Sequence, residues 1–429
     1  MLMTKKVTSL KKSDINKSDI RHSNIMKKEK VKKTWISLVV LSVVFSCFIL
    51  PATAQNTIPP PTKTYRVGIF APLYLDTIFT NTGTIRFTDA IPKFITPGLE
   101  FVHGAQIALD SMKLASENVE AFIYDTKSYT KTIPRLISDK KLDTLDIIIG
   151  SVKDVDFRQL ADFALTKNIP FISATYPNDG GVTANPSLVI VNSTLKAHCE
   201  AIFSYLVQSH GTDRIFLCRQ KGPQEDKVAA YFRMINVQDG KPLLDIQTLN
   251  FDSIVSPGLL KNRLDSNRQT VIIGGSLDET FATKLTMACY ELHESYPITL
   301  IGMPNWDSFK ELMNKDALVD FPVFFTSPYF NTKWDDYSKM VNAVYAKKYK
   351  ARATDMVFKG FECTWLFTKL LTKFPGNVIS HINDKSFKLI TDYNFRPVML
   401  KKDAPVTDYY ENKHLYFVRI MNGTIAKAW

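Results

Sequence analysis

Short apolar segments alternate with amphipathic segments along most of the chain. The apolar segments are rich in β-branched residues and are apolar throughout, as in "DIIIGS" and "TVIIGG". Strands of this kind are covered on both faces in a folded protein. Between them, stretches such as Leu99–Lys113 and Asp156–Lys167 repeat apolar residues at helical spacing. A succession of strand, helix and strand is typical of βαβ units, so the pattern predicts an α/β fold with parallel sheets.

The number of apolar segments indicates more than one sheet. A first series comprises "RVGIFAPL", "VEAFIYD", "DIIIGS", "PFISAT" and "LVIVN", and a second comprises "RIFLCR", "LLDIQTL", "TVIIGG", "ITLIGM" and "VFFTSP". A single hydrophobic core stops growing beyond about 250–300 residues. We therefore expect two doubly wound parallel-sheet lobes of about five strands each, joined by a hinge.

Later segments set the expected boundaries of the lobes. Ser193–His210 is an amphipathic stretch that would open the second lobe, and Thr354–Leu371 is a long helix with an apolar face. The chain closes with "HLYFVRIMNGTIAKAW", two strand-like runs joined by Asn422-Gly423, a dipeptide that favours a hairpin. We expect lobe 1 to comprise residues 65–193 and 327–390, and lobe 2 to comprise residues 194–326 and 391–429.

The N-terminal 64 residues lack this pattern. A basic run, Met26–Lys33, precedes an uncharged apolar run, Trp35–Leu50, and "PATA" follows with the small-residue spacing that a signal peptidase reads. The apolar run is shorter than the roughly 20 residues of a membrane-spanning helix. We expect a signal peptide over residues 26–54 and a proline-rich linker over 55–64. Residues 1–25 are either a non-native extension or a long basic region that starts at Met1.

Removal of this leader changes the charge of the chain. The first 54 residues carry 11 of the 54 Lys and Arg and 3 of the 42 Asp and Glu, which leaves a net charge of +4 rather than +12. Neither a nucleic-acid partner nor a membrane-surface partner follows from that balance. An exported, periplasmic protein is expected, with a lipid anchor at Cys47 as the alternative. The other cysteines lie in apolar runs, as in "RIFLCR" and "FECTWLF", so we expect them to be unpaired.

No familiar catalytic motif occurs in the sequence. It contains no Gly-x-Gly-x-x-Gly, Walker loop, Gly-x-Ser-x-Gly, His-Glu-x-x-His or Cys-x-x-Cys, and its histidines lack ligand spacing. We therefore expect a protein that is not an enzyme and that needs neither a cofactor nor a metal.

Several predicted strands end in small or hydroxyl-bearing residues. These ends are Gly150-Ser151, Ser173-Ala174-Thr175 and Gly274-Gly275-Ser276. Open α/β sheets bind ligands outside the carboxyl ends of their strands, where glycine permits close approach and hydroxyls donate and accept hydrogen bonds. Serine and threonine are also ordinary helix N-caps. The recurrence of such ends in both halves favours a binding cleft.

In order and spacing, these segments resemble the type I periplasmic binding proteins, the group similar to branched-chain amino-acid-binding proteins. The resemblance runs from about Tyr65 to Trp429 and rests on "VGIFAPL", "FVHGAQIALDSM", "FIYDT", "IIIGS", "PFISAT", "IIGGSLDE" and "YFVRIMNGT". It implies a ligand cleft between two lobes. Pro72 would end the first strand, because it cannot donate a ladder hydrogen bond. The long loop Leu73–Pro97 would then form a lip or lid over the ligand, with surface decoration as the alternative.

The resemblance also implies ligand contacts. Family members hold a ligand carboxylate with a hydroxyl after the third strand and an Ala-x-Thr-like pair after the fourth. Ser151 matches the first position, and Ser173-Ala174-Thr175 matches the second.

In the second lobe, family members contact the ligand's amino end with an aromatic residue and an acid. Here Ser276 replaces the aromatic residue, and Met303-Pro304-Asn305 stands where the acid is expected. With Arg219 and Lys221 after the second lobe's first strand, this departure favours a neutral or anionic ligand over an α-amino acid. The expected ligand-binding residues are Tyr74, Gly150, Ser151, Ser173, Ala174, Thr175, Arg219, Gly275, Ser276, Asn305 and Trp306. Among them, Tyr74 and Trp306 are candidate stacking walls.

The function that this resemblance implies is capture of a small polar solute, for an ABC-type importer with a membrane permease as partner. A sensory or regulatory ectodomain of the same fold, which would contact a receptor, is the alternative. An exported α/β hydrolase is a third option that lacks a nucleophile motif. We expect a monomer.

Overall fold

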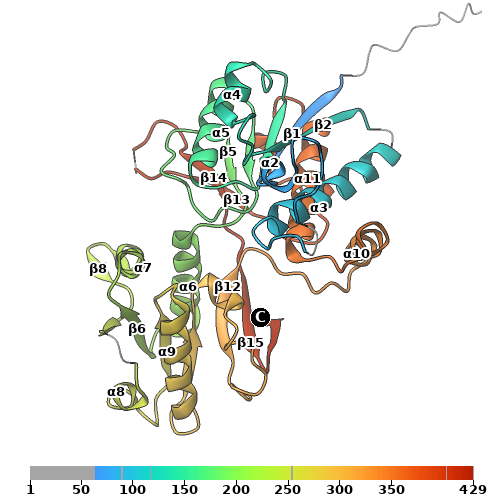
Figure 1. The fold of residues 1–429 in the computed structure, drawn as a ribbon. Coiled ribbons are helices and arrows are strands. Elements are labelled where there is room, and N and C mark those ends of the chain that lie inside the picture. The colour runs from blue at the N-terminus through green and yellow to red at the C-terminus, as the bar shows by residue number, and fades with distance from the viewer. Residues whose placement is uncertain (1–62, 88–89, 116, 253–254, 402, 429) are drawn as a thin grey trace, which may run out of the picture. The chain divides into compact units, whose positions relative to one another are not determined.

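A computed structural model describes residues 63–87, 90–115, 117–252, 255–401 and 403–428. Within them the chain forms two seven-stranded sheets with flanking helices, which we call lobe 1 and lobe 2 (Figure 1). None of the helices among these residues is long and apolar enough to cross a membrane. The expected extension, the signal peptide with Cys47, and most of the linker lie outside the described residues.

The first sheet has the strand order β13-β14-β5-β4-β3-β1-β2. Its strands are β1 (Tyr65–Ala71), β2 (Val119–Asp125), β3 (Ile147–Gly150), β4 (Phe171–Ser173), β5 (Leu188–Ile190), β13 (Phe395–Val398) and β14 (Tyr409–Asn412). All neighbours pair in parallel except β13 and β14, which pair antiparallel. The five parallel strands predicted for lobe 1 are thus confirmed, and two later strands extend the sheet.

Helices cover both faces of the first sheet, as the apolar strands require (Figure 1). One face packs against α3 (Thr96–Leu114) and α11 (Asp355–Lys373), and the other packs against α4 (Ile133–Ser138) and α5 (Asp154–Lys167). Successive residues of β1 alternate between these cores, with Ile69 toward α3 and α11 and Phe70 toward α5. The short α2 (Leu75–Ile78) lies in the loop after β1, and α10 (Asp336–Tyr349) packs on α3 and α11.

The second sheet repeats this plan in the order β16-β15-β12-β11-β10-β6-β9. Its strands are β6 (Arg214–Gln220), β9 (Ile246–Phe251), β10 (Thr270–Gly274), β11 (Ile298–Ile301), β12 (Val323–Ser327), β15 (Tyr416–Met421) and β16 (Thr424–Lys427). Its helices are α6 (Leu195–Ser209), α7 (Pro223–Ile235), α8 (Pro257–Lys261) and α9 (Glu279–Leu292). The remaining elements are a two-stranded ribbon, β7 (Val237–Gln238) with β8 (Lys241–Pro242), and the 3-10 turns η1 (Pro304–Ser308), η2 (Ile379–His381) and η3 (Lys385–Phe387).

The predicted hairpin and the predicted thiols are confirmed. Met421 pairs with Thr424 across the turn, and both Asn422 (φ 51°) and Gly423 (φ 70°) adopt the left-handed conformation that such a turn requires. Four cysteines in the described residues are free and buried, namely Cys199, Cys218, Cys289 and Cys363. Burial raises the pKa of each of these thiols, because a thiolate is poorly solvated in an apolar core.

One expected lobe boundary is wrong. Strands β13 and β14 belong to the first sheet, so residues 395–412 lie in lobe 1 and not in lobe 2. Both strands are short, "FRPV" and "YYEN", and β14 pairs with β5 from much earlier in the chain, a long-range contact without a local pattern. The chain therefore crosses between the sheets after β5, after β12 and after β14.

Candidate functional site

The strand order places a topological switch point in each lobe. In lobe 1 the chain leaves β1 toward β2 on one side and returns to β3 on the other. The helices that follow these strands therefore lie on opposite faces, and in open α/β sheets such a switch point, outside the carboxyl ends of the strands, is where ligands bind. Pro72 follows β1 and Ser151 follows β3. In lobe 2, β6 and β10 hold the corresponding places.

Two predicted hydroxyls meet at the lobe 1 switch point. The Ser151 and Thr175 hydroxyl oxygens lie 3.0 Å apart, and either can donate the hydrogen bond. The Ser151 amide donates to the Phe70 carbonyl at 2.8 Å, which fixes this residue beside the end of β1. The Asn192 side chain donates to the Thr175 carbonyl at 2.7 Å. Both hydroxyls are thus held in place at the strand ends by backbone contacts with neighbouring segments.

The other predicted lobe 1 residues lie beneath this pair. Gly150 ends β3, and a Cβ there would sit 3.0 Å from the Phe171 ring. Ala174 is buried, and its amide donates to the Gly150 carbonyl at 2.9 Å. Ser173 is fully buried, and its hydroxyl has no hydrogen-bond partner within the described part of the chain. All three residues are buried, so we assign them no ligand contact.

Tyr74 sits where the loop after β1 is fixed by an acid. The Asp125 carboxylate, at the end of β2, accepts from the amides of Leu73 (2.9 Å), Tyr74 (3.1 Å), Leu75 (2.7 Å) and Lys127 (2.9 Å). Tyr74 takes a left-handed conformation with φ 55°, and its half-buried ring meets the edge of Phe94 at 4.9 Å between centroids. Asp125 therefore sets the direction in which the loop leaves the sheet.

Sequence reasoning missed charged and phenolic groups on the same edge. Lys127 lies two residues after β2, and its amine contacts the Asp156 carboxylate of α5 at 2.7 Å. Burial opposes the charged amine, yet the hydrogen bond and charge of Asp156 raise the pKa of Lys127. The Tyr176 hydroxyl donates to Asp154 at 3.1 Å. Both Lys127 and Tyr176 follow strand ends, and that position was the available clue.

The predicted polar residues of lobe 2, Ser276 and Arg219, bond to side chains of α7. The Ser276 hydroxyl donates to the Glu225 carboxylate of α7 at 2.6 Å, and both residues are buried. Arg219 pairs with Asp226 of the same helix. Gly275 leaves room for Leu217, because a Cβ there would lie 2.7 Å from that side chain. This arrangement holds α7 against the end of β10.

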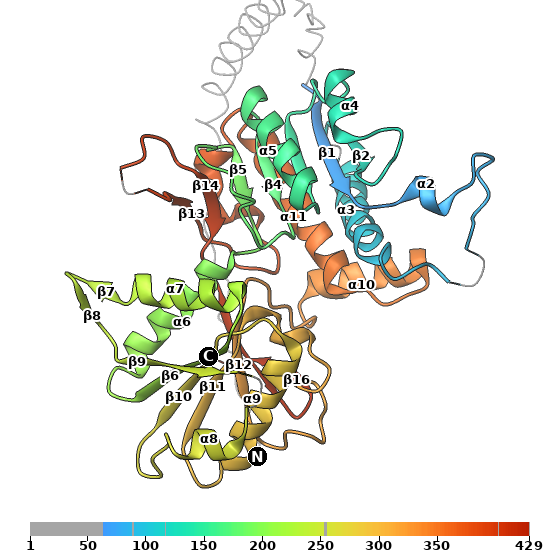
Figure 2. The same cartoon turned by 60° about the vertical axis from the view of Figure 1, so that its left-hand side comes forward.

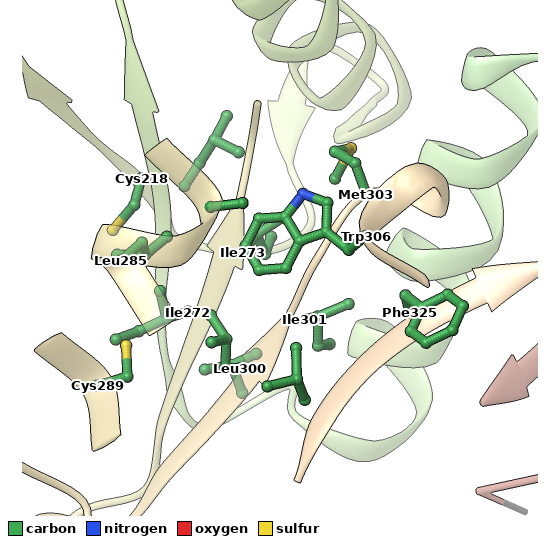
Figure 3. Close-up of a cluster of buried hydrophobic side chains, with 14 of the residues drawn as sticks. Cys218, Ile272, Ile273, Leu285, Cys289, Leu300, Ile301, Met303, Trp306 and Phe325 are labelled. Carbon is green, nitrogen blue, oxygen red and sulfur yellow. The ribbon is translucent and has the colours of Figure 1, made fainter. Parts of the chain in front are cut away.

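Trp306 is a core residue, so its prediction as a stacking wall is wrong. Its side chain is fully buried in lobe 2 among Ile273, Ile301 and Met303 (Figure 3), and its indole nitrogen donates to the Ser276 carbonyl at 2.9 Å. Its ring fills the space left by two glycines: a Cβ at Gly274 or Gly302 would lie 2.3 or 2.2 Å from it. No face of the ring is open to a ligand.

An acid, Asp307, follows Trp306 in the 3-10 turn after β11. Asn305 donates from its side-chain amide to the Leu277 carbonyl at 2.8 Å, while its side-chain oxygen is buried without a partner among the described residues. Asp307 lies two positions further on, in η1, and is exposed. The expectation that Met303-Pro304-Asn305 stands in place of the family's acid stays a prediction, because Asp307 lies outside those three positions. Within the described ranges, no group of three or more His, Cys, Asp or Glu side chains could hold a metal ion.

Comparison with solved structures finds the same fold. A protein from Rhodospirillum rubrum, provisionally assigned as a branched-chain amino acid ABC transporter, matches with a TM-score of 0.62 at 12% identity, over 85% of this chain and 100% of that one. A branched chain amino acid ABC transporter periplasmic ligand-binding protein from Burkholderia xenovorans gives 0.55 at 13%, over 83% and 90%. An ABC transporter substrate-binding protein from Desulfitobacterium hafniense, in complex with leucine, gives 0.52 at 10%, over 85% and 100%.

Sequence comparison gives the family directly. Among curated proteins, none matches this chain. The family model described as "Periplasmic binding protein" matches residues 94–378, which is more than half of the chain. That range includes the hydroxyl pair of lobe 1 and the lobe 2 switch point. Together with the two lobes, whose five parallel strands follow the same order, this match shows that the chain belongs to the periplasmic binding proteins, with the type I fold.

Proposed function

We propose that the chain is an exported solute-binding protein that captures a small polar molecule and presents it to a membrane permease of an ABC-type importer. The observation that carries this proposal is the Ser151–Thr175 hydroxyl pair at the lobe 1 switch point. Because one hydroxyl donates to the other, the second keeps its proton to donate to a ligand oxygen, and both oxygens can accept. Helix α5, which has 14 residues, begins three positions after Ser151, and its first-turn acids Asp154 and Asp156 bond to Tyr176 and Lys127. Export rests on the leader pattern alone.

The ligand class follows from the groups at this edge. The Ser151 and Thr175 hydroxyls suit an oxygen-rich or carboxylate-bearing solute. Asp307, two positions beyond Asn305, is an exposed acid that can pair with an ammonium group of a ligand. Leucine, which the Desulfitobacterium hafniense protein binds, therefore belongs among the candidates together with carboxylates that lack an amine.

A thermal-shift screen tests this proposal. The panel contains amino acids, mono- and dicarboxylates and neutral sugars, each added to the purified protein. A ligand at 100 times its Kd stabilises the folded state by about 2.7 kcal/mol and raises Tm. We expect a carboxylate-bearing compound to raise Tm in the native protein, and the shift to shrink in a Ser151→Ala, Thr175→Ala double variant. An equal shift in that variant would place the ligand elsewhere.

A further inference from the structure

A second cavity lies under the loop between β1 and α3. Its volume is about 320 Å³, and its walls are mainly apolar side chains of the loop and of α3, among them Phe79, Ile85, Phe87, Leu99 and Val102. Small-molecule sites span roughly 300–1,000 Å³ and are lined chiefly by such residues. In Figure 2 the loop with α2 extends from the end of β1 on the side away from β4 and β5.

Hydrogen bonds fix the backbone of the loop, so its apolar side chains do not need to pack together to hold it in place. The Asp76 carboxylate accepts from the Ser128 hydroxyl and the Tyr129 amide, each at 2.8 Å. Phe79 and Ile85 form an isolated bridge, and the Arg86 amide donates to the Ile78 carbonyl at 2.8 Å. With the bonds to Asp125 described above, these contacts fix the backbone, and the hollow beneath it stays open.

The apolar walls are unusually exposed. Leu75 is 43% exposed, Phe79 37%, Ile85 55%, Phe87 38% and Ile91 59%. Single exposed apolar residues are common on protein surfaces, but a contiguous group around a hollow marks a place where something apolar binds. A ligand in the hollow would cover the inner sides of these residues.

One polar group in the wall lacks a partner. The His103 Nδ1 atom is buried and has no hydrogen-bond partner among the described residues, although His103 lines the cavity. Its ring stacks on Tyr349 at 3.8 Å between centroids. Burial, and then the charge of Lys348, lower the pKa of His103, which favours the neutral imidazole. A neutral ring nitrogen can bond a hydroxyl or carboxyl group as donor or as acceptor.

We propose that this cavity binds a small amphiphile, an aliphatic or aromatic molecule whose apolar body fills the hollow and whose hydroxyl or carboxyl group bonds to His103. At roughly 30 Å³ for each water-sized group, the cavity has room for about ten carbon atoms. This site uses none of the residues assigned to the polar solute, and the proposal does not rest on the solute-binding function.

Fluorescence titration with naphthalene as the dye, a ten-carbon fluorescent molecule without a polar group, tests the site, with decanoate and 1-decanol as competitors. The purified native protein should bind the dye saturably at one site, and both competitors should displace it. The Ile85→Ser, Phe87→Ser double variant removes two exposed walls, so it should fold normally and bind the dye at least tenfold more weakly. Val155→Ser, at a residue of α5 that is 54% exposed, is the matched control and should bind as the native protein does.

Two further variants separate the possible outcomes. His103→Phe keeps the ring stack, so it should leave dye binding unchanged while weakening both competitors about fivefold. Ser151→Ala should change neither. Binding that does not saturate, or that is equal in the native protein and the double variant, would overturn the site. Loss of dye binding in Ser151→Ala would assign the dye to the strand-end site and also contradict the proposal.

Discussion

At the scale of single residues, a position directly after a strand indicated which side chains lie at the sheet edge. It did not indicate which other side chains they contact. Ser151 and Thr175 were predicted from their positions after β3 and β4, and they meet. Ser276 was predicted on the same grounds, but its partner Glu225 comes from a helix 51 positions earlier. Trp306 was predicted as a stacking wall of the cleft, although Gly274 at the end of β10 and Gly302 after β11 leave the space that its ring fills. Such pairings need three-dimensional proximity, which local patterns do not contain.

Asp125 gives a prediction at this scale. In Asp125→Asn, the side-chain oxygen can still accept from three amides, but the new amide group would face the Leu75 amide, and two donors cannot bond. We expect the free energy of unfolding to fall by about 1–3 kcal/mol. Urea denaturation followed by circular dichroism measures it. Asp316→Asn, at an exposed acid, is the control; equal stability of the two variants would show that Asp125 does not anchor the loop.

At the scale of elements, the apolar runs and helical repeats predicted the parallel strands and their covering helices correctly. The close packing of α3 on α11 was not visible in either pattern. Gly104 faces the backbone of α11, where a Cβ would lie 1.9 Å from the Val357 carbonyl oxygen. Gly360 faces α3 in the same way, 2.0 Å from the Phe101 carbonyl oxygen. The two helices therefore approach backbone to backbone, and each glycine is needed because of the other helix.

Alanine at either glycine should push the helices apart. We expect Gly104→Ala and Gly360→Ala each to destabilise the protein by about 1–3 kcal/mol or more, since backbone atoms cannot move aside as a side chain can. Gly258→Ala, in α8, meets nothing within 4 Å and should be neutral or stabilising by up to about 1 kcal/mol. Thermal unfolding of the three variants checks the contrast. A Tm for Gly104→Ala as high as that of Gly258→Ala would contradict the close approach.

At the scale of the whole molecule, both lobes share one plan, and the segments that cross between them are tied together. The Thr194 amide donates to Glu411 at 2.7 Å, and the Ser193 hydroxyl donates to the Asn412 carbonyl at 2.6 Å. Sequence reasoning predicted the two lobes and a hinge. It misplaced residues 395–412, because sheet membership of two short strands depends on pairing with β5 and not on their own pattern.

A buried acid near these crossings makes stability depend on pH. Glu362 of α11 accepts from the amides of Ile390 and Thr391 and from the Thr391 hydroxyl, yet burial raises its pKa from 4.5 to about 7. The folded state therefore holds the proton more tightly than the unfolded chain does. Its stabilising contribution is complete below pH 4.5 and is lost as the pH rises through about 7.

Glu362→Gln should remove this dependence. Glutamine can accept from the two amides and donate to the threonine hydroxyl, so the fold should persist. The difference in unfolding free energy between native protein and variant should change by on the order of 2–3 kcal/mol between pH 4.5 and 7.5, with the native protein losing stability as the pH rises. Urea titrations at several pH values measure it. Parallel curves for the two proteins would show that Glu362 has the same pKa folded and unfolded.

Isothermal titration calorimetry on the hydroxyl pair tests the central claim most directly. The best ligand from the screen is titrated into the native protein, Ser151→Ala, Thr175→Ala, the double variant, and Thr166→Ala as a control at an exposed hydroxyl near the far end of α5. Each single change at the pair should weaken binding by about 1–3 kcal/mol. The double change should cost less than the sum, because the two hydroxyls bond each other at 3.0 Å. Unchanged affinity in both single variants would contradict a solute site at the ends of β3 and β4.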